Sequence, residues 1–172
     1  MSLFQNIVII LVLIAGAGFL SLTEIALAGA RKVKLKILAE SGDDRAQKVL
    51  NLQENSADFF AASQIGLNAV AILGGILGEG AFRPYFMSFV ARFYTGPWSE
   101  TISFALSFTL VTSLFILFAD LMPKRLAMIA PEKISIAVIN PIQVFIKVCK
   151  PLAWIINALA NLLFRLFKVN TT

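Results

Sequence analysis

An aspartate and a proline mark the end of a long apolar run. Asp120 follows the uncharged stretch 102–119, and Pro123 comes three residues later, followed by Lys124. Proline has no amide hydrogen, so in an α-helix Pro123 leaves the carbonyl of Ala119 without its usual donor. A free carbonyl oxygen beside a carboxylate offers two ligands of the type that hard cations such as Mg²⁺ prefer. These residues therefore predict half of a cation-binding site.

Other oxygen-bearing side chains occur in two earlier apolar runs. Ser21 and Glu24 are three residues apart, which places them on one face of a helix, and Thr23 lies beside them. Asn68 shares a helical face with Gln64 in the next run. The expected cation-binding residues, with Pro123 as the helix kink, are Ser21, Thr23, Glu24, Asn68, Ala119 and Asp120.

Each of these residues also has a structural interpretation. Asp120 and Glu24 lie near the ends of their runs, where a carboxylate can reach water at low cost. The hydroxyls of Ser21 and Thr23 can bond to carbonyls of their own helix. Lys124 follows Asp120 by four residues and is a candidate charge partner. The residues alone leave both interpretations open.

The composition excludes several other kinds of site. The chain has no histidine and one cysteine, which excludes Ser-His-Asp and Cys-His catalysis, histidine-bound zinc and an internal disulfide. Because no nucleophile–base pair is present, we expect that the protein is not an enzyme, and we expect no nucleic-acid partner. Hydrophobic residues make up 58% of the chain and charged residues 15%, with a mean hydropathy of +0.82. These values predict an integral membrane protein.

Three apolar runs are long enough to cross a bilayer, so we expect an all-α membrane protein forming a single domain over 1–172. A spanning helix needs ~20 apolar residues, and the runs predict spans at about 3–29, 57–79 and 100–122. A signal peptide is the alternative for the first run, but that run lacks a basic start and is too long.

The remaining segments combine basic residues with apolar residues at helical spacing. They predict amphipathic juxtamembrane helices at about 31–54 and 132–168. A solvated hairpin is the alternative for the first segment, and a fourth span over 151–167 for the second. We expect Pro141 and Pro151 to interrupt the second segment.

The basic residues predict the topology. Six Lys and Arg residues lie between the first and second runs and seven follow the third, but only Arg83 and Arg92 lie between the second and third. Because basic residues collect on the cytoplasmic side, we expect the N-terminus outside and the C-terminus in the cytoplasm.

Three stretches, in order, resemble the motifs of one family. They are FLSLTEIAL at 19–27, SGDDRAQKVLNL at 41–52 and ADLMPKRLA at 119–127. The chain is similar to the transmembrane domain of the CorC/CNNM (HlyC/CorC, cyclin M) transporter family. This resemblance implies a homodimer in the lipid bilayer, with three spans per subunit and juxtamembrane helices on the cytoplasmic side. Related proteins continue into cytoplasmic CBS modules and a C-terminal domain, which we expect to be absent from this chain.

The resemblance also implies a Mg²⁺ site made of serine, asparagine and glutamate side chains and a glycine carbonyl. If the cation is Mg²⁺, the matching ligands here are Ser21, Asn68, the Ala119 carbonyl and Asp120. Alanine and aspartate replace the usual glycine and glutamate, and the asparagine spacing of the second run differs.

The amino-acid sequences of the second and third runs resemble those of a bacterial branch of this family that is implicated in polyamine export. We therefore expect a bacterial inner-membrane domain that exports putrescine-like polyamines. Transport of Mg²⁺ or another divalent cation is one alternative, and a non-transporting dimeric scaffold for cytoplasmic modules is another.

Overall fold

The described part of the chain consists of helices joined by short connections. A computed structural model describes the backbone of residues 3–166, and their side chains except those of 3, 157 and 160–166. The expected second juxtamembrane segment therefore ends, at 168, outside the described residues. The chain forms two compact units: the first contains 3–25 and 66–129, and the second contains 26–65 and 130–166.

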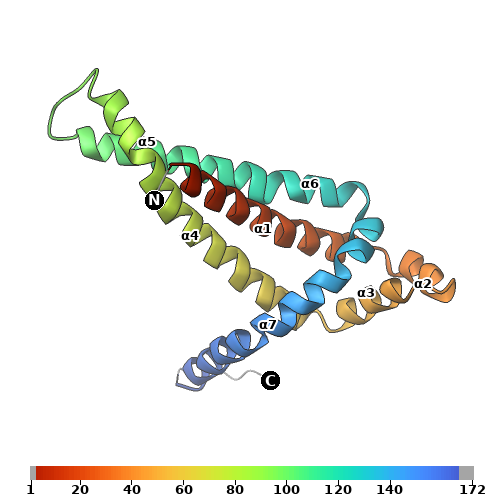
Figure 1. Ribbon diagram of the computed structural model, residues 1–172. Coiled ribbons are helices and arrows are strands. Elements are labelled where there is room, and N and C mark those ends of the chain that lie inside the picture. The colour runs from red at the N-terminus through yellow and green to blue at the C-terminus, as the bar shows by residue number, and fades with distance from the viewer. Residues whose placement is uncertain (1–2, 167–172) are drawn as a thin grey trace. The chain divides into compact units, whose positions relative to one another are not determined.

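The first unit contains parts of three helical segments of spanning length. They are α1 (Leu3–Gly29, as far as residue 25), α4 (Ala57–Val90, from residue 66), α5 (Ser99–Leu114), the π-helix η1 (Phe115–Leu121) and α6 (Met122–Ile129). The last three follow one another without a break, and Figure 1 shows α1 running alongside them. Helices suit a lipid environment because every backbone polar group is satisfied within its own segment.

Two glycines let α4 approach α5 and η1 closely. A Cβ atom placed on Gly74 would overlap the ring of Phe115, and one on Gly78 would overlap the side chain of Val111. Each glycine therefore receives a large side chain from the facing helix. The small-xxx-small pair predicts this type of packing between helices in lipid.

Helix α4 is longer than the sequence predicted. The expected span ended at about 79, but the helix continues through Pro84 to Val90. An ion pair between Arg83 and Glu79, one turn apart, stabilises this extension, and the Ser88 hydroxyl donates to the Pro84 carbonyl at 3.0 Å. The connection to α5 is correspondingly short, at 91–98. Polar residues that suggested a loop thus lie on a helix.

The second unit joins the end of α1 and the start of α4 to three further helices, namely α2 (Lys32–Glu40), α3 (Asp44–Glu54) and α7 (Pro131–Leu166). Helices α2 and α3 form a hairpin, and Gly42 in its turn has a φ of +97°, which glycine adopts without strain. Asp43 caps α3 by accepting a hydrogen bond from the Arg45 amide at 3.0 Å. The hairpin thus has a defined turn and a capped second helix.

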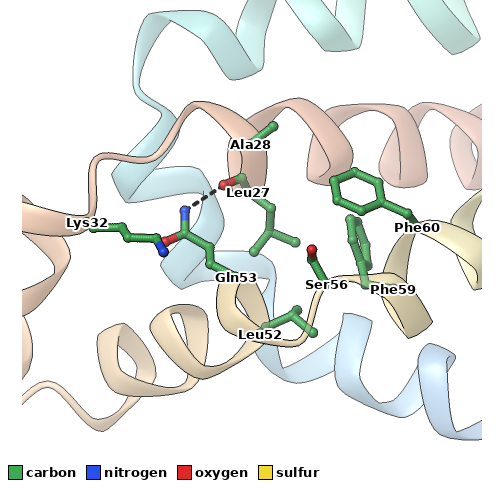
Figure 2. A pocket seen from close by; sticks show the side chains of 8 residues that line it. All are labelled: Leu27, Ala28, Lys32, Leu52, Gln53, Ser56, Phe59 and Phe60. Atoms are coloured by element: carbon green, nitrogen blue, oxygen red, sulfur yellow. Dashed lines mark hydrogen bonds between the residues drawn. The ribbon is translucent and has the colours of Figure 1, made fainter. Parts of the chain in front are cut away.

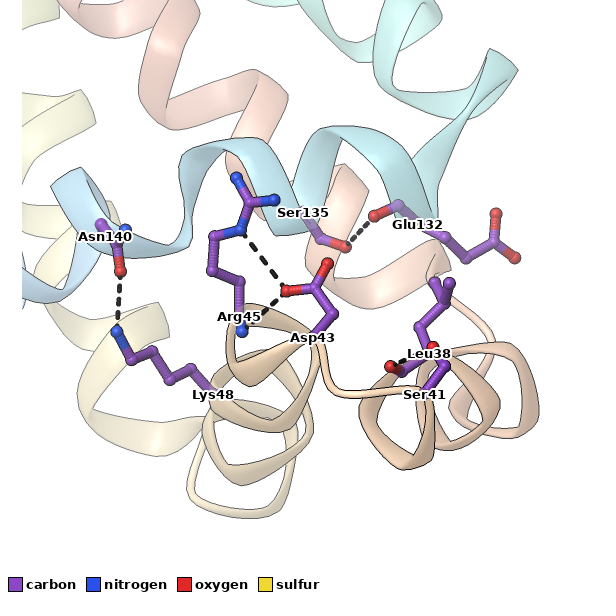
Figure 3. A network of polar contacts seen from close by, with 8 residues as sticks. All are labelled: Leu38, Ser41, Asp43, Arg45, Lys48, Glu132, Ser135 and Asn140. Atoms are coloured by element: carbon purple, nitrogen blue, oxygen red, sulfur yellow. Dashed lines mark hydrogen bonds and ion pairs between the residues drawn. The ribbon is translucent and has the colours of Figure 1, made fainter.

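The core of the second unit lies where α3 packs on α7. Val49, Ile139 and Ile142 are fully buried in it. Polar contacts surround this core: Figure 3 shows Lys48 donating to Asn140, with 3.1 Å between Nζ and Oδ1. The same figure shows the Ser135 hydroxyl on the Glu132 carbonyl.

The carboxylate of Glu132 also joins α7 to the start of the hairpin. Its Oε1 lies 3.0 Å from Nε of Arg31 and 3.6 Å from Nζ of Lys34. Several independent contacts therefore attach α7 to the basic hairpin.

The prolines of α7 do not interrupt it, so that prediction was wrong. The helix runs continuously through Pro141 and Pro151. A proline inside a helix costs about 3 kcal/mol. Burial of Ile139 and Ile142, on either side of Pro141, contributes about 1.5–3 kcal/mol each. Packing against α3 therefore offsets the lost hydrogen bond at Pro141.

The number of helices long and apolar enough to span a bilayer also differs from the expected three. The described residues contain four such helices, which are Phe4–Gly29, Ala57–Val90, Ser99–Ile129 and Pro131–Ile156. The fourth falls on the segment that we expected to lie at the membrane surface, and it begins 20 residues before the alternative span at 151–167. The all-α membrane architecture is as predicted.

Candidate functional site

Asp120 lies at the centre of a cluster in the first unit. Its Oδ1 atom accepts a hydrogen bond from the Ser21 hydroxyl at 2.7 Å and lies 2.6 Å from Nζ of Lys124. Ser21 is fully buried, whereas the side chain of Asp120 is 47% exposed. Within the described residues Oδ2 has no partner. One carboxylate oxygen is thus held by the protein and the other is available to a ligand.

A change of helix type positions this carboxylate. Asp120 belongs to η1, in which the Met122 amide donates to the carbonyl of Leu117, five residues earlier. Pro123 has no amide hydrogen, so it cannot donate to Phe118, the next carbonyl in this five-residue register. We expected the affected carbonyl to be that of Ala119, because we assumed α-helical spacing. Segments of π-helix occur frequently at functional sites.

Helix α1 approaches this segment at Gly18. A Cβ atom on Gly18 would lie 3.4 Å from the Phe118 carbonyl oxygen and 3.2 Å from Cγ of Pro123. The Phe118 oxygen therefore faces α1, on the side where Gly18 and Ser21 lie one turn apart. Ala119 is buried nearby in the same segment and remains a predicted ligand.

The other predicted residues do not bond to this cluster. The Thr23 hydroxyl donates to the Phe19 carbonyl of its own helix at 2.7 Å. Glu24 is half-buried and Asn68 is exposed, and neither has a partner among the described residues. The structure thus brings together Ser21, Asp120 and Lys124, and it leaves Thr23, Glu24 and Asn68 as predictions.

No acidic or cysteine cluster in the described part of the chain suits a metal ion. Groups of three or more Asp, Glu, Cys or His side chains at a metal-binding spacing do not occur there. A cation at Asp120 would therefore have a single carboxylate, with hydroxyl and carbonyl oxygens as its other ligands.

Sequence reasoning missed two features. The first is the close approach of Gly18 to the Phe118 carbonyl. A sequence signal for it was present, because Gly18 lies three residues before Ser21 on the same helical face. The second is a pair of charges on α4, Glu79 and Arg83, whose i,i+4 spacing indicated a helical ion pair. The expected span ended at about 79, so Arg83 lay outside it.

The charged group on α4 extends to α5. Nε of Arg83 lies 2.7 Å from Oε1 of Glu79, and Nη1 lies 3.7 Å from Oε1 of Glu100. The guanidinium also lies over the ring of Phe104, with 5.4 Å between Cζ and the ring centroid. This group lies where α4 and α5 approach their connection, far from Asp120 along the helix.

In the second unit, Gln53 of α3 fixes the end of α1. Its Nε2 donates to the carbonyls of Leu27 at 2.7 Å and Ala30 at 2.9 Å, and Figure 2 shows the first of these bonds. The residues of Figure 2 line a cavity of about 200 Å³. Because the carbonyls that end a helix lack intrahelical partners, this contact joins α1 firmly to the hairpin.

Comparison with known proteins adds the family. Residues 8–172 match the family described as "Cyclin M transmembrane N-terminal domain". The chain is 54% identical to the "Polyamine export protein" of Escherichia coli strain K12 over 167 residues, which are 97% of this chain and 37% of that protein.

Two further relatives extend this comparison. The chain is 44% identical to the "Polyamine export protein" of Haemophilus influenzae over 171 residues, which cover 99% of this chain and 40% of that protein. It is 29% identical to "UPF0053 protein YhdT" of Bacillus subtilis over 164 residues, 95% of this chain and 36% of that protein. The chain thus spans about two-fifths of the length of these relatives.

Proposed function

Because the chain belongs to the cyclin M transmembrane domain family, we propose that it is a cation transport domain that exports an aliphatic polyamine such as putrescine. The contact between the Lys124 ammonium and the Asp120 carboxylate carries this proposal. Lysine ends in a primary ammonium on a methylene chain, as putrescine does. An alkylammonium group therefore already occupies one oxygen of this carboxylate.

The oxygens around Asp120 suit a protonated amine. A primary ammonium has three N–H donors and needs three acceptors. Asp120 Oδ2, the Ser21 hydroxyl oxygen and the carbonyl oxygen of Phe118 or Ala119 supply that number. Relatives named polyamine export proteins at 44–54% identity support the same cargo. We propose transport and not catalysis.

Transport of Mg²⁺ is the second candidate. It is favoured by the carboxylate and the carbonyl oxygens that adjoin Pro123, which are ligands suited to a hard cation. A fully protein-ligated Mg²⁺ needs close to octahedral geometry, and in this arrangement Asn68 and Asp120 would both contribute. A dimeric scaffold without transport is the third candidate, and it assigns Asp120 no role in moving a cation.

The proposed topology follows from the charges. The N-terminus lies outside and α2, α3 and α7 lie on the cytoplasmic face of a bacterial inner membrane, because most Lys and Arg residues occur there. Three helices then cross the bilayer, and α7 lies at the surface beside the basic hairpin. The ion pairs of Glu132 with Arg31 and Lys34 support this position for α7. The subunits form a homodimer, as the family resemblance implies.

A transport assay tests the cargo. The protein expressed from its complete gene is reconstituted in liposomes, and flux of radiolabelled putrescine is compared with flux of Mg²⁺ reported by a fluorescent indicator. We expect putrescine flux that Asp120→Asn reduces at least roughly tenfold, since the carboxylate contact would be worth at least 1.4 kcal/mol. Asp58→Asn is the matched control, because Asp58 forms only a surface ion pair with Lys150.

The competing candidates predict other outcomes. Asp120-dependent Mg²⁺ flux without putrescine flux would replace the polyamine with a divalent cation. If neither cargo moves and Asp120→Asn leaves cellular polyamine resistance unchanged, the domain is a scaffold.

A further inference from the structure

A groove between α4 and α5 lies in the first unit, between Asp120 and the α4–α5 connection. Its volume is about 530 Å³. Each helix lines the groove with residues four apart along the chain. They are Ala71, Gly75 and Glu79 on α4, and Phe104, Phe108 and Thr112 on α5. Because eight residues separate the first and last residue on each helix, the groove is about 12 Å long at 1.5 Å per residue.

The lining of the groove changes along its length. Ile72, Gly75 and Ile76 make one wall apolar, and Phe104 and Phe108 stack on the other, with ring centroids 5.8 Å apart and an interplanar angle of 15°. The carboxylate of Glu79, whose side chain is only 16% exposed, closes one end. An apolar groove that ends at a carboxylate suits a ligand with a methylene chain and a cationic end.

The charges at that end do not balance. Glu79 and Glu100 carry two negative charges, and Arg83 contacts both with its single positive charge. The sum of −1, +1 and −1 leaves this group with a net charge of −1. One further positive charge on Glu79 would neutralise it.

Arg83 itself shows how a cation sits there. Its guanidinium lies against the Glu79 carboxylate and over the face of the Phe104 ring. A cation within about 6 Å of a ring centroid is attracted by the ring, and carboxylate and ring together bind organic cations. Arg83 therefore occupies the position that an alkylammonium group would take.

We propose that this groove is a second binding site for the alkylammonium cargo, and that Arg83 is a tethered competitor. When the cargo binds, its ammonium takes the place of Arg83 on Glu79 and its methylene chain lies along Phe104 and Phe108. Arg83 then pairs with Glu100 alone, which is 69% exposed and already 3.7 Å away. Glu79, Arg83 and Glu100 are each paired in that state, and the second ammonium of a diamine such as putrescine lies toward the Thr112 end of the groove. This inference rests on the proposed function, because the cargo is the same.

The two sites lie at different depths in the membrane. Phe104, at the charged end of the groove, and Asp120 are sixteen residues apart on the continuous helix α5–η1–α6, or about 24 Å at 1.5 Å per residue. That distance is most of the thickness of the hydrocarbon core of a bilayer, which is about 30 Å. With Asp120 on the cytoplasmic side, the groove is the site that the cargo meets on leaving.

The test measures binding of radiolabelled putrescine to the protein expressed from its complete gene, purified in phosphatidylcholine nanodiscs. All variants carry Asp120→Asn, so that the assay measures putrescine binding to the groove alone. We expect Arg83→Gln to tighten binding roughly two- to fivefold, the size of a partly exposed ion pair. Arg92→Gln, which removes the same charge from the nearby connection, is the control and is expected to change nothing.

Two further variants should weaken binding. We expect Glu79→Gln to weaken it at least roughly tenfold, and Phe104→Leu to weaken it roughly threefold, since Leu keeps the apolar wall and removes the ring face. The gain expected from Arg83→Gln cannot arise from misfolding, so the test does not depend on the stability of the Glu79 variant.

The outcomes separate this inference from the proposed function. If Asp120-dependent putrescine flux is present but Arg83→Gln leaves binding unchanged, the second site is wrong. If wild-type protein transports no putrescine while binding still follows Arg83 and Glu79, the site stands and the proposed transport fails. If Phe104→Leu alters the oligomeric mass and not putrescine binding, the groove is a protein interface and the inference is overturned.

Discussion

A methyl group added at Gly18 should disturb the Asp120 site through Pro123. The new Cβ would lie 3.2 Å from Cγ of Pro123, so this atom must move by a few tenths of an ångström, whereas the Phe118 carbonyl oxygen, at 3.4 Å, would be in ordinary contact. The proline cannot move easily, because its ring is rigid and closed on the backbone. Gly16, on the same helix, has nothing within 4 Å of its Cβ position, so Gly16→Ala is the matched control.

The expected size follows from two opposing effects. Replacing glycine by alanine inside a helix stabilises it by about 0.5–1 kcal/mol. Adding a methyl group to a filled site costs about 1–3 kcal/mol. Gly16→Ala receives only the first effect, whereas Gly18→Ala receives both. The free energies of unfolding of the two variants should therefore differ by about 1–3 kcal/mol.

Thermal unfolding in detergent, followed by circular dichroism, measures this difference. For a chain of this length 1 kcal/mol corresponds to about 2–4 °C, so Gly18→Ala should unfold roughly 2–12 °C below Gly16→Ala. Gly18→Ala should also weaken putrescine binding, while Gly16→Ala should leave it unchanged. Equal melting temperatures and equal affinities for the two variants would refute the placement of Pro123 against α1.

Two other substitutions probe the packing of each unit. Gly78→Ala should destabilise the first unit by about 1–3 kcal/mol, because its Cβ would overlap Val111. Gly75→Ala is the control, since the space around its Cβ is open. Equal thermal stability of the two variants would argue against close packing at Gly78. Gln53→Leu should lower the free energy of unfolding by about 1 kcal/mol, because loss of two hydrogen bonds is partly offset by removal of the buried, unpaired Oε1. The control is Gln47→Leu, on the exposed face of α3. Amide hydrogen exchange at the end of α1 should be faster in Gln53→Leu than in Gln47→Leu, and equal exchange rates would contradict the capping role.

The architecture was predictable because each helix carries its own signal. The long apolar run that begins at Leu3 indicated a helix, and the structure has one from Leu3 to Gly29. The end of α4 was misplaced because Glu79, Arg83 and Pro84 suggested a loop, and their contacts with α5 are not visible in a linear sequence. The prolines of α7 were misjudged for a related reason, since burial against α3 compensates for what Pro141 removes.

The residue types of the candidate site were predictable, but their geometry was not. Ser21 and Asp120 are 99 residues apart, and their hydrogen bond depends on how α1 packs against η1. The choice between the Ala119 and Phe118 carbonyls depends on a π register, which no local pattern in the sequence indicated. The π segment lies where Gly18 of α1 closely approaches Pro123, which is a property of two helices together.

The π segment also gives this helix a way to rotate. An α-helix turns by 100° per residue, and a π segment holds one residue in excess of that repeat. If the excess residue moves along the chain, the side chains it passes turn by about 100° while the backbone stays hydrogen-bonded. Such a shift would swing Asp120 away from Ser21 without unfolding either helix.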